Sequence, residues 1–257
     1  MDDLTAKAEA LLADMKPTSP SAAPGQNMLP PDTRRDVPGE FAPSPVWRAG
    51  DGPATLFVHG WDDTHRVWRQ FAMDFIQNQR PALLMDLPGH GASDAANAGW
   101  AAAGAAVRDV CAAEGPIDTI IAHSFGGIAT LRAIELGAVA DYVVLIAPPL
   151  SDAKGGFRDR QMKKGYPEDV ISRAESLHLE RTGLPISRTD WRAVLEGFGG
   201  KVLIVGSEAD TECPLDAMEA LADGLEHVSV LAYDDLEHRD LAQDRAVLAD
   251  VLAFLGY

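Results

Sequence analysis

Short apolar runs recur along most of the chain and alternate with longer amphipathic segments. Six runs have the character of buried strands: ATLFV (54–58), ALLM (82–85), IDTIIA (117–122), YVVLI (142–146), KVLIV (201–205) and VSVL (228–231). Helical periodicity lies between most of them and after the last, in residues 67–77, 100–113, 128–137 and 241–255. Apolar strands that alternate with helices predict a three-layer α/β/α fold with a mostly parallel sheet.

The first 45 residues follow a different pattern. Residues 1–16 place an apolar stripe on one side of a helix, formed by Leu4, Ala8, Leu11, Leu12 and Met15. Positions 17–45 then hold eight of the 17 prolines. Because proline lacks a backbone N–H and has a fixed φ, we expect an extended arm there, without a helix or a central strand. The predicted organisation is an N-terminal helix and Pro-rich arm over 1–45, followed by one domain over 46–257.

One interval interrupts the alternation of strands and helices. Between the strand that ends near Ile146 and the strand that starts at Lys201, the sequence shows no strand signal. A proline at 167 followed by two acidic residues is typical of a helix start. We interpret residues 151–197 as a helical lid inserted over the carboxyl edge of the sheet.

The formal net charge of the chain is −17, from 22 Lys and Arg against 39 Asp and Glu. This balance disfavours nucleic acid and anionic lipid as partners. Residues 151–200 differ, since nine basic and eight acidic residues give this segment a net charge of +1. A solvated helical surface accounts for that difference. A sharper hypothesis is that residues 155–165 help to admit anionic substrates.

The sequence gives no sign of a membrane segment, a secretory signal or a disulfide framework. No stretch approaches the ~20 apolar residues that a membrane span needs. The MDD start lacks a basic region ahead of an apolar one. Cys111 and Cys213 are too few for a disulfide framework or a thiolate metal site, and the histidines show no ligand spacing. A cytoplasmic protein without a metal or cofactor is the expectation.

Glycine-containing or charged turns follow most of the predicted strands. These are HGW (59–61), DLPGHGASD (86–94), HSFGG (123–127), GSEAD (206–210) and LEHRD (236–240). In parallel sheets, ligands bind outside the carboxyl ends of the strands. We therefore expect these five turns to meet around one site.

Ser124 lies where the third predicted strand turns into a helix. A serine at such a junction can act as a nucleophile, because strain in the turn exposes its Oγ above the sheet. The turn brings the strand and helix backbones close, so it needs small residues two places before and after the serine. Ala122 and Gly126 meet that requirement. A serine that only caps the helix is the structural alternative.

A serine nucleophile needs a base, and the base needs an orienting acid. His238 is the predicted base, because it lies on a loop between the last strand and the last helix. Asp210 is the predicted acid, at the end of the turn after KVLIV, and the chain order Ser124, Asp210, His238 fits this arrangement. Glu208, two residues away, and Asp152, after the fourth strand, remain alternative acids.

The remaining histidines and the second glycine-rich turn are interpreted as structural. His59, His90 and His123 lie inside motifs and are expected to bond neighbouring loops. His65, His178 and His227 do not follow a predicted strand. Gly89 and Gly91 allow positive φ in the tight turn after the second strand.

With these motifs in this order, the chain resembles the α/β-hydrolase superfamily over roughly residues 54–150 and 200–257. The resemblance implies the α/β-hydrolase fold and an oxyanion hole formed by the backbone N–H groups of Trp61 and Phe125. The Trp61 ring is expected to wall the acyl pocket or simply to pack. The strand pair that precedes the His-Gly motif in this superfamily is poorly visible here.

The resemblance implies a serine hydrolase that cleaves a carboxylic ester or thioester through an acyl-enzyme on Ser124. A small-molecule ester or thioester is then the expected partner, and the N-terminal arm makes a homodimer conceivable. A C–C bond hydrolase or a lyase can use the same three residues, because pocket shape decides the reaction. A non-catalytic, ligand-binding homologue is the third alternative.

Overall fold

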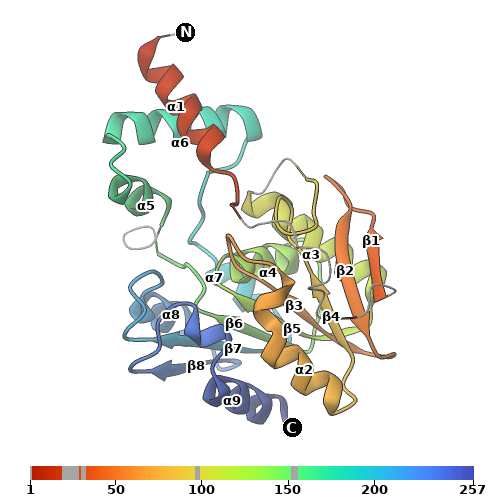
Figure 1. Ribbon diagram of the computed structural model, residues 1–257. Coiled ribbons are helices and arrows are strands. Elements are labelled where there is room, and N and C mark those ends of the chain that lie inside the picture. Colours follow the sequence, from red (N-terminus) through yellow and green to blue (C-terminus); the bar gives the residue numbers. More distant parts are fainter. Residues whose placement is uncertain (1, 19–28, 30–32, 96–98, 152–155) are drawn as a thin grey trace.

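The computed structural model describes residues 2–18, 29, 33–95, 99–151 and 156–257. An eight-stranded sheet runs through the centre of the molecule in the order β1-β2-β4-β3-β5-β6-β7-β8 (Figure 1). The strands are β1 (Arg34–Val37), β2 (Ser44–Ala49), β3 (Ala54–Val58), β4 (Ala82–Met85), β5 (Ile117–His123), β6 (Tyr142–Ile146), β7 (Lys201–Ser207) and β8 (Val228–Tyr233). The six strands predicted from apolar runs are all present.

Helices flank the sheet on both faces, as the alternating pattern predicts. They are α2 (Arg69–Gln77), which continues the 3₁₀ helix η2 (His65–Trp68), α3 (Trp100–Glu114), α4 (Phe125–Glu135), α7 (Arg192–Glu196), α8 (Leu215–Ala222) and α9 (Arg245–Leu255). Helix α3 packs against α4, whereas α2 and α9 lie side by side on the other face (Figure 1). Phe75 of α2 contacts the ring of Tyr257 just after α9, with ring centroids 6.1 Å apart.

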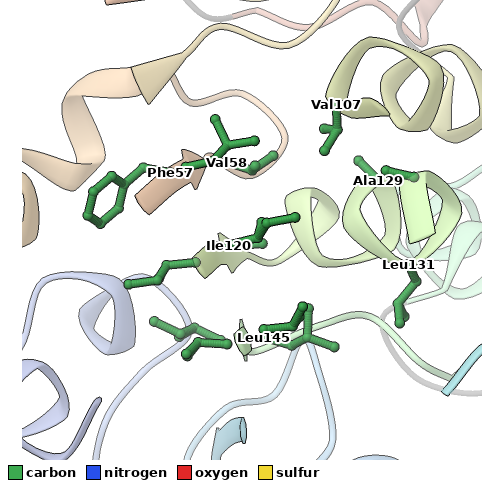
Figure 2. Close-up of a cluster of buried hydrophobic side chains, with 14 of the residues drawn as sticks. Phe57, Val58, Val107, Ile120, Ala129, Leu131 and Leu145 are labelled. Atoms are coloured by element: carbon green, nitrogen blue, oxygen red, sulfur yellow. The ribbon is translucent and has the colours of Figure 1, made fainter. Parts of the chain in front are cut away.

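The core lies on both faces of the central strands. All five residues of β3 are buried, and Phe57 and Val58 lie beside Ile120 of the neighbouring strand β5 (Figure 2). Val107 of α3 and Leu145 of β6 belong to the same cluster. Burying one such side chain stabilises the fold by roughly 1.5–3 kcal/mol. Strands buried on both faces give the continuous apolar runs from which they were predicted.

The antiparallel edge of the sheet lies in the segment that was expected to be an extended arm. Strand β1 pairs antiparallel with β2, and β2 pairs antiparallel with β4. The expected boundary between residues 45 and 46 therefore falls inside β2. Proline is tolerated because Pro45 is near the start of β2, where its carbonyl accepts a hydrogen bond from the Asp86 N–H at 3.0 Å. The exposed β1 sequence RRDV has no apolar run to reveal it.

A second, separate apolar cluster lies outside the sheet. Helix α1 (Asp3–Asp14) packs along α6 (Glu168–Thr182), and α5 (Phe157–Lys163) completes the group (Figure 1). We call these three helices the outer helical cluster. Its buried residues are Ala8, Leu11, Phe157, Val170, Ile171, Ala174 and Leu177. The predicted stripe of the first helix thus covers part of the interval predicted to be a lid.

Polar contacts fasten α1 to α6. Arg181 forms an ion pair with Glu9, and the Arg173 Nε–H donates a hydrogen bond to Thr5 Oγ1 at 3.2 Å.

Among the described residues, the structure contains no helix that is both long and apolar enough to cross a membrane.

Substituting Leu11→Ala will loosen the outer helical cluster, because Leu11 is 1% exposed in its centre. Truncating a buried leucine costs about 2–5 kcal/mol of stability. Hydrogen exchange measured by mass spectrometry should speed up in α1 and α6 and remain unchanged in β3 to β6. The matched control is Leu179→Ala on α6, whose side chain is 51% exposed. Equal effects of the two substitutions would contradict a separate apolar centre.

Candidate active site

Ser124 occupies a strained turn between β5 and α4. Its backbone angles are φ 50° and ψ −124°, a conformation that a residue with a side chain rarely adopts. The turn is held by the Ser124 N–H, which donates to the Ile146 carbonyl at 2.8 Å, and by the Gly127 N–H, which donates to the Ser124 carbonyl. Strain at this point lifts the side chain off the strand and leaves Oγ facing the pocket.

The turn comes very close to strand β3, and this explains which small residues it needs. A Cβ at Gly126 would lie 2.5 Å from the His59 carbonyl oxygen and 2.6 Å from that of Val58. Both contacts are with backbone, so nothing can move aside cheaply. Ala122, in contrast, is fully buried in β5 with its methyl group accommodated. Alanine therefore suffices before the serine, whereas glycine is required after it.

The structure brings Ser124, His238 and Asp210 together, with His238 between the other two. Its Nε2 lies 2.9 Å from Ser124 Oγ, and its Nδ1 lies 2.8 Å from Asp210 Oδ2. The carboxylate can only accept, so the proton is on Nδ1 and Nε2 is free to accept the Ser124 hydroxyl proton. The three side chains come from the ends of β5, β7 and β8, which meet at one edge of the sheet.

Asp210 is held as a carboxylate. Its Oδ1 accepts the backbone N–H groups of Glu212 and Cys213, at 2.8 and 3.0 Å. Burial by itself raises the pKa of Asp210, but the hydrogen bond from His238, the charge of His238 and the two amides outweigh it. The net pKa lies below the ordinary value of 3.8. An ionised Asp210 keeps the proton of His238 on Nδ1.

His123, directly before the serine, contacts the backbone of the predicted base. Its Nε2–H donates to the His238 carbonyl at 3.0 Å, and the two rings lie 4.9 Å apart. Burial and then the charge of His238 lower the pKa of His123 to about 3. The ring therefore remains neutral and anchors the loop that carries His238. His123 thus has a structural role in this site, which is to hold the backbone of His238.

Trp61 and Phe125, the residues predicted to form an oxyanion hole, both lie next to the serine turn in the chain or in space. Phe125 is the first residue of α4, where helical N–H groups have no partner inside the helix. Gly60 lies against the turn, since a Cβ there would be 3.0 Å from Ser124 Cβ. The Trp61 ring contacts the Phe125 ring edge to face, with centroids 5.2 Å apart, and both residues line the pocket.

The loop after β4 is organised by Asp86, a residue that the sequence interpretation missed. Its carboxylate accepts the backbone N–H and the Nδ1–H of His65, at 2.8 and 2.9 Å, and the Ala92 N–H at 2.9 Å. His59 accepts the Leu87 N–H through Nε2. His65 has no strand-end position in the sequence, so only the fold brings it to Asp86. The loop is architectural, as expected, and supports the turn that carries Trp61.

A pocket of about 430 Å³ opens above Ser124 and His238. The body of the protein supplies Trp61, Trp100, Phe125 and Ile128, and the outer helical cluster supplies Phe157 and Gln161. Met15 and Thr18 close another side, and the Thr18 N–H donates to Asp62 Oδ1 at 2.5 Å. The chain after α1 thus reaches the loop that holds Trp61. The pocket lies between the two apolar clusters of the molecule.

The alternative acids differ in what the structure says of them. Glu208 is exposed, and its N–H is paired with the Tyr233 carbonyl, so it belongs to the surface beside Asp210. Asp152 lies outside the described residues. Among the described residues, one group has metal-ligand atoms within 4.8 Å of one another: Asp210, Cys213 and His238. The hydrogen bond between Asp210 and His238 already joins two of these three.

The eight-stranded, mostly parallel sheet with helices on both faces is the α/β-hydrolase fold. The sequence matches the Alpha/beta hydrolase family over residues 55–255, and the chain belongs to that family. Helix α1 and strands β1 and β2 precede the matched residues.

Similar solved structures share the fold at low sequence identity. The Pyrococcus furiosus esterase Pf2001 has a TM-score of 0.70 and 15% identity, with 94% of this chain and 98% of that one covered. The esterase RhEst1 from Rhodococcus sp. ECU1013 has a TM-score of 0.67 and 17% identity, covering 87% and 98%. The uncharacterized protein Rv2715 of Mycobacterium tuberculosis is 32% identical over 106 residues, which are 38% of this chain and 30% of that relative.

Substituting Gly126→Ala will destabilise the protein markedly, because the added methyl group meets two backbone carbonyl oxygens of β3 and the following turn. Overpacking of this kind costs about 1–3 kcal/mol or more. Thermal denaturation should show a clear fall in Tm. Gly199→Ala is the control, since a Cβ there meets nothing within 4 Å. A Tm of Gly126→Ala equal to that of the control would show that the close approach is absent.

Lowering the pH will destabilise the fold in a window set partly by His90. Burial and then the charge of His59 lower the pKa of His90 to about 4, from an ordinary 6.5. Between pH 6.5 and about pH 4, His90 is mostly protonated in the unfolded chain but mostly neutral in the folded protein. Stability should therefore fall as the pH drops from 6.5 towards 4, by at most about 1.4 kcal/mol per pH unit from this residue.

The comparison that isolates this effect is with His90→Asn. Asparagine can still donate to the Pro88 carbonyl, which His90 Nδ1 contacts at 2.9 Å, but it does not titrate. Urea unfolding measured at several pH values should give a shallower pH dependence for the variant in this window. Parallel curves for the two proteins would mean that His90 titrates normally in the folded state.

Proposed function

We propose that the protein is a serine hydrolase that cleaves a carboxylic ester or thioester through an acyl-enzyme on Ser124. The observation that carries this proposal is the pair of hydrogen bonds at His238, which accepts from the Ser124 hydroxyl through Nε2 at 2.9 Å and donates to Asp210 through Nδ1 at 2.8 Å. They join a nucleophile on a strained turn to a base and an oriented acid, at the floor of a pocket. The esterases with a similar fold support this class of reaction.

In the proposed first half-reaction, Ser124 Oγ attacks the carbonyl carbon while His238 Nε2 takes its proton. The imidazolium that forms is stabilised by the Asp210 carboxylate. The negative charge on the tetrahedral intermediate faces the N–H groups of Trp61 and Phe125, and one such donor is worth roughly 3–4 kcal/mol in comparable sites. His238 then gives the proton to the leaving alcohol or thiol, and the acyl group stays on Ser124.

In the second half-reaction, His238 takes a proton from a water molecule that attacks the acyl carbon, and it returns this proton to Ser124 Oγ as the ester bond to the serine breaks and the acid leaves. His123 would contribute to both steps in two ways. It donates a hydrogen bond to the His238 carbonyl, and it carries no positive charge that would repel the His238 imidazolium. The outer helical cluster would act as the lid over this chemistry, and the substrate would be a small molecule that fits a pocket of about 430 Å³.

A fluorophosphonate probe tests the nucleophile. We expect a covalent adduct on the peptide that contains Ser124, and its loss in Ser124→Ala but not in Ser176→Ala, a serine on the surface of α6. Hydrolysis of a p-nitrophenyl ester should fall at least about a thousandfold in Ser124→Ala, and comparably in Asp210→Asn.

The outcomes separate the alternatives. Labelling together with ester hydrolysis supports the proposal. Labelling without hydrolysis of any ester or thioester would favour a C–C bond hydrolase or a lyase that uses the same residues. An unmodified Ser124 in the folded protein would refute a serine nucleophile and leave a ligand-binding homologue.

A further inference from the structure

The walls of the pocket carry an unusual share of the protein's positive charge. The chain has a net charge of −17, yet five cations line this pocket: Lys16, Arg160, Lys164, Arg188 and Arg239. Arg188 is used elsewhere, since it pairs with Glu135 at 2.8 Å. Among the described residues, the other four have no ion-pair partner. The charge of Arg239 does act on Asp63, so Lys16, Arg160 and Lys164 are the cations that we consider for a ligand.

Two of these cations point the same way from one helix. Arg160 and Lys164 are four residues apart at the end of α5 and so lie on the same side of it. Lys163 lies between them in sequence but pairs with Asp159 at 2.8 Å and does not line the pocket. On this helix, Lys163 is therefore paired with Asp159 away from the pocket, whereas Arg160 and Lys164 line the pocket.

The charges of two arginines that line the pocket act on groups next to Ser124 and Asp210. Burial raises the pKa of the Cys213 thiol, Asp210 adds to the rise, and the charge of Arg160 opposes it. Arg160 therefore reaches towards the loop that holds Asp210. Burial and the charge of His238 lower the pKa of His123, and the charge of Arg239 contributes further. Arg239, which follows His238 on the loop after β8, is therefore near the strained turn that carries Ser124.

Three of the four acidic residues that line the pocket accept a hydrogen bond within the protein, and the fourth, Glu212, lies beside the Asp210 turn. Asp62 accepts the Thr18 N–H at 2.5 Å, and Asp63 accepts the Thr64 N–H at 2.9 Å, both on the loop after β3. Asp14 accepts the Tyr166 hydroxyl at 3.4 Å, and Glu212 follows the Asp210 turn. The α5 side of the pocket thus presents Arg160 and Lys164, whereas the loop after β3 presents Asp62 and Asp63.

We propose that the substrate is an anionic ester, whose carboxylate lies against Arg160 and Lys164 while its ester carbonyl lies at Ser124. This inference rests on the proposed serine hydrolase function and names its substrate class. A guanidinium fork matches the geometry of a carboxylate, and a neighbouring ammonium adds a second charge. The pocket volume suits a compact molecule, such as a half-ester of a short dicarboxylic acid.

Steady-state kinetics on two esters of similar size test the substrate class. The anionic probe is the mono-p-nitrophenyl ester of glutaric acid, and the neutral probe is p-nitrophenyl pentanoate. In the double variant Arg160→Gln, Lys164→Gln we expect KM for the anionic ester to rise about tenfold, with KM for the neutral ester within about twofold of wild type. Raising the salt concentration should weaken only the anionic reaction of the wild type.

The control is Lys163→Gln, which removes one positive charge directly beside Lys164, and it is compared with the single variant Lys164→Gln as well as with the double variant. Because Lys163 is paired with Asp159 and faces away from the pocket, both KM values should remain within about twofold of wild type. A loss specific to the pocket-facing pair supports the proposal. Equal changes for the two esters, or equal changes in the control, would overturn it.

A second measurement separates this inference from the proposed function. Glutarate should protect Ser124 from the fluorophosphonate probe in the wild type but not in the double variant, whereas pentanamide should protect both proteins equally. If Ser124 is labelled but glutarate gives no added protection, the anionic class is wrong and the serine nucleophile stands. If Ser124 does not react at all, the proposed function fails first.

Discussion

The site depends on one close approach between backbones. Where β5 turns into α4, the chain lies so near to β3 that only a glycine fits at position 126. That proximity holds Ser124 at a positive φ and places its Oγ within reach of His238. It also brings Gly60 against the serine, so the loop that carries Trp61 belongs to the same assembly. The central strands, with their apolar faces covered on both sides, supply the rigidity that keeps this strain in place.

Around this turn, the remaining polar groups form a hierarchy of support. Asp210 orients His238, and two backbone amides orient Asp210. His123 fixes the backbone of His238 from the opposite side, while remaining neutral. The Asp86 carboxylate joins the loop after β4 to the loop after β3, because it accepts hydrogen bonds from the backbone and ring of His65 and from the Ala92 N–H. Each residue of the proposed triad is therefore held in place by hydrogen bonds from its neighbours before any substrate binds, and this is what preorganisation means in physical terms.

The sequence predicted those parts whose signal is local. The parallel strands are continuous apolar runs, and Ser124, Asp210 and His238 could be named because each follows such a run. Strand β1 was missed because the edge strand RRDV has a single apolar residue, and β2 was missed because the nearby prolines favoured an arm. His65 was dismissed because nothing within its segment indicates Asp86, which is 21 residues away. The packing of α1 on α6 was equally hidden, since a stripe shows that a helix is covered but not by what.

The division of the outer helical cluster between distant parts of the chain has a consequence for biosynthesis. Glu9 and Arg181, which join α1 to α6, are 172 residues apart, so the first helix leaves the ribosome long before its partner exists. Until then its leucine stripe has no apolar surface of its own to cover, and the ordering of α1 must wait for α6. The wall that α1 contributes to the pocket is consequently among the last features to form. A nascent chain can complete the sheet through β6 while the pocket is still open on this side.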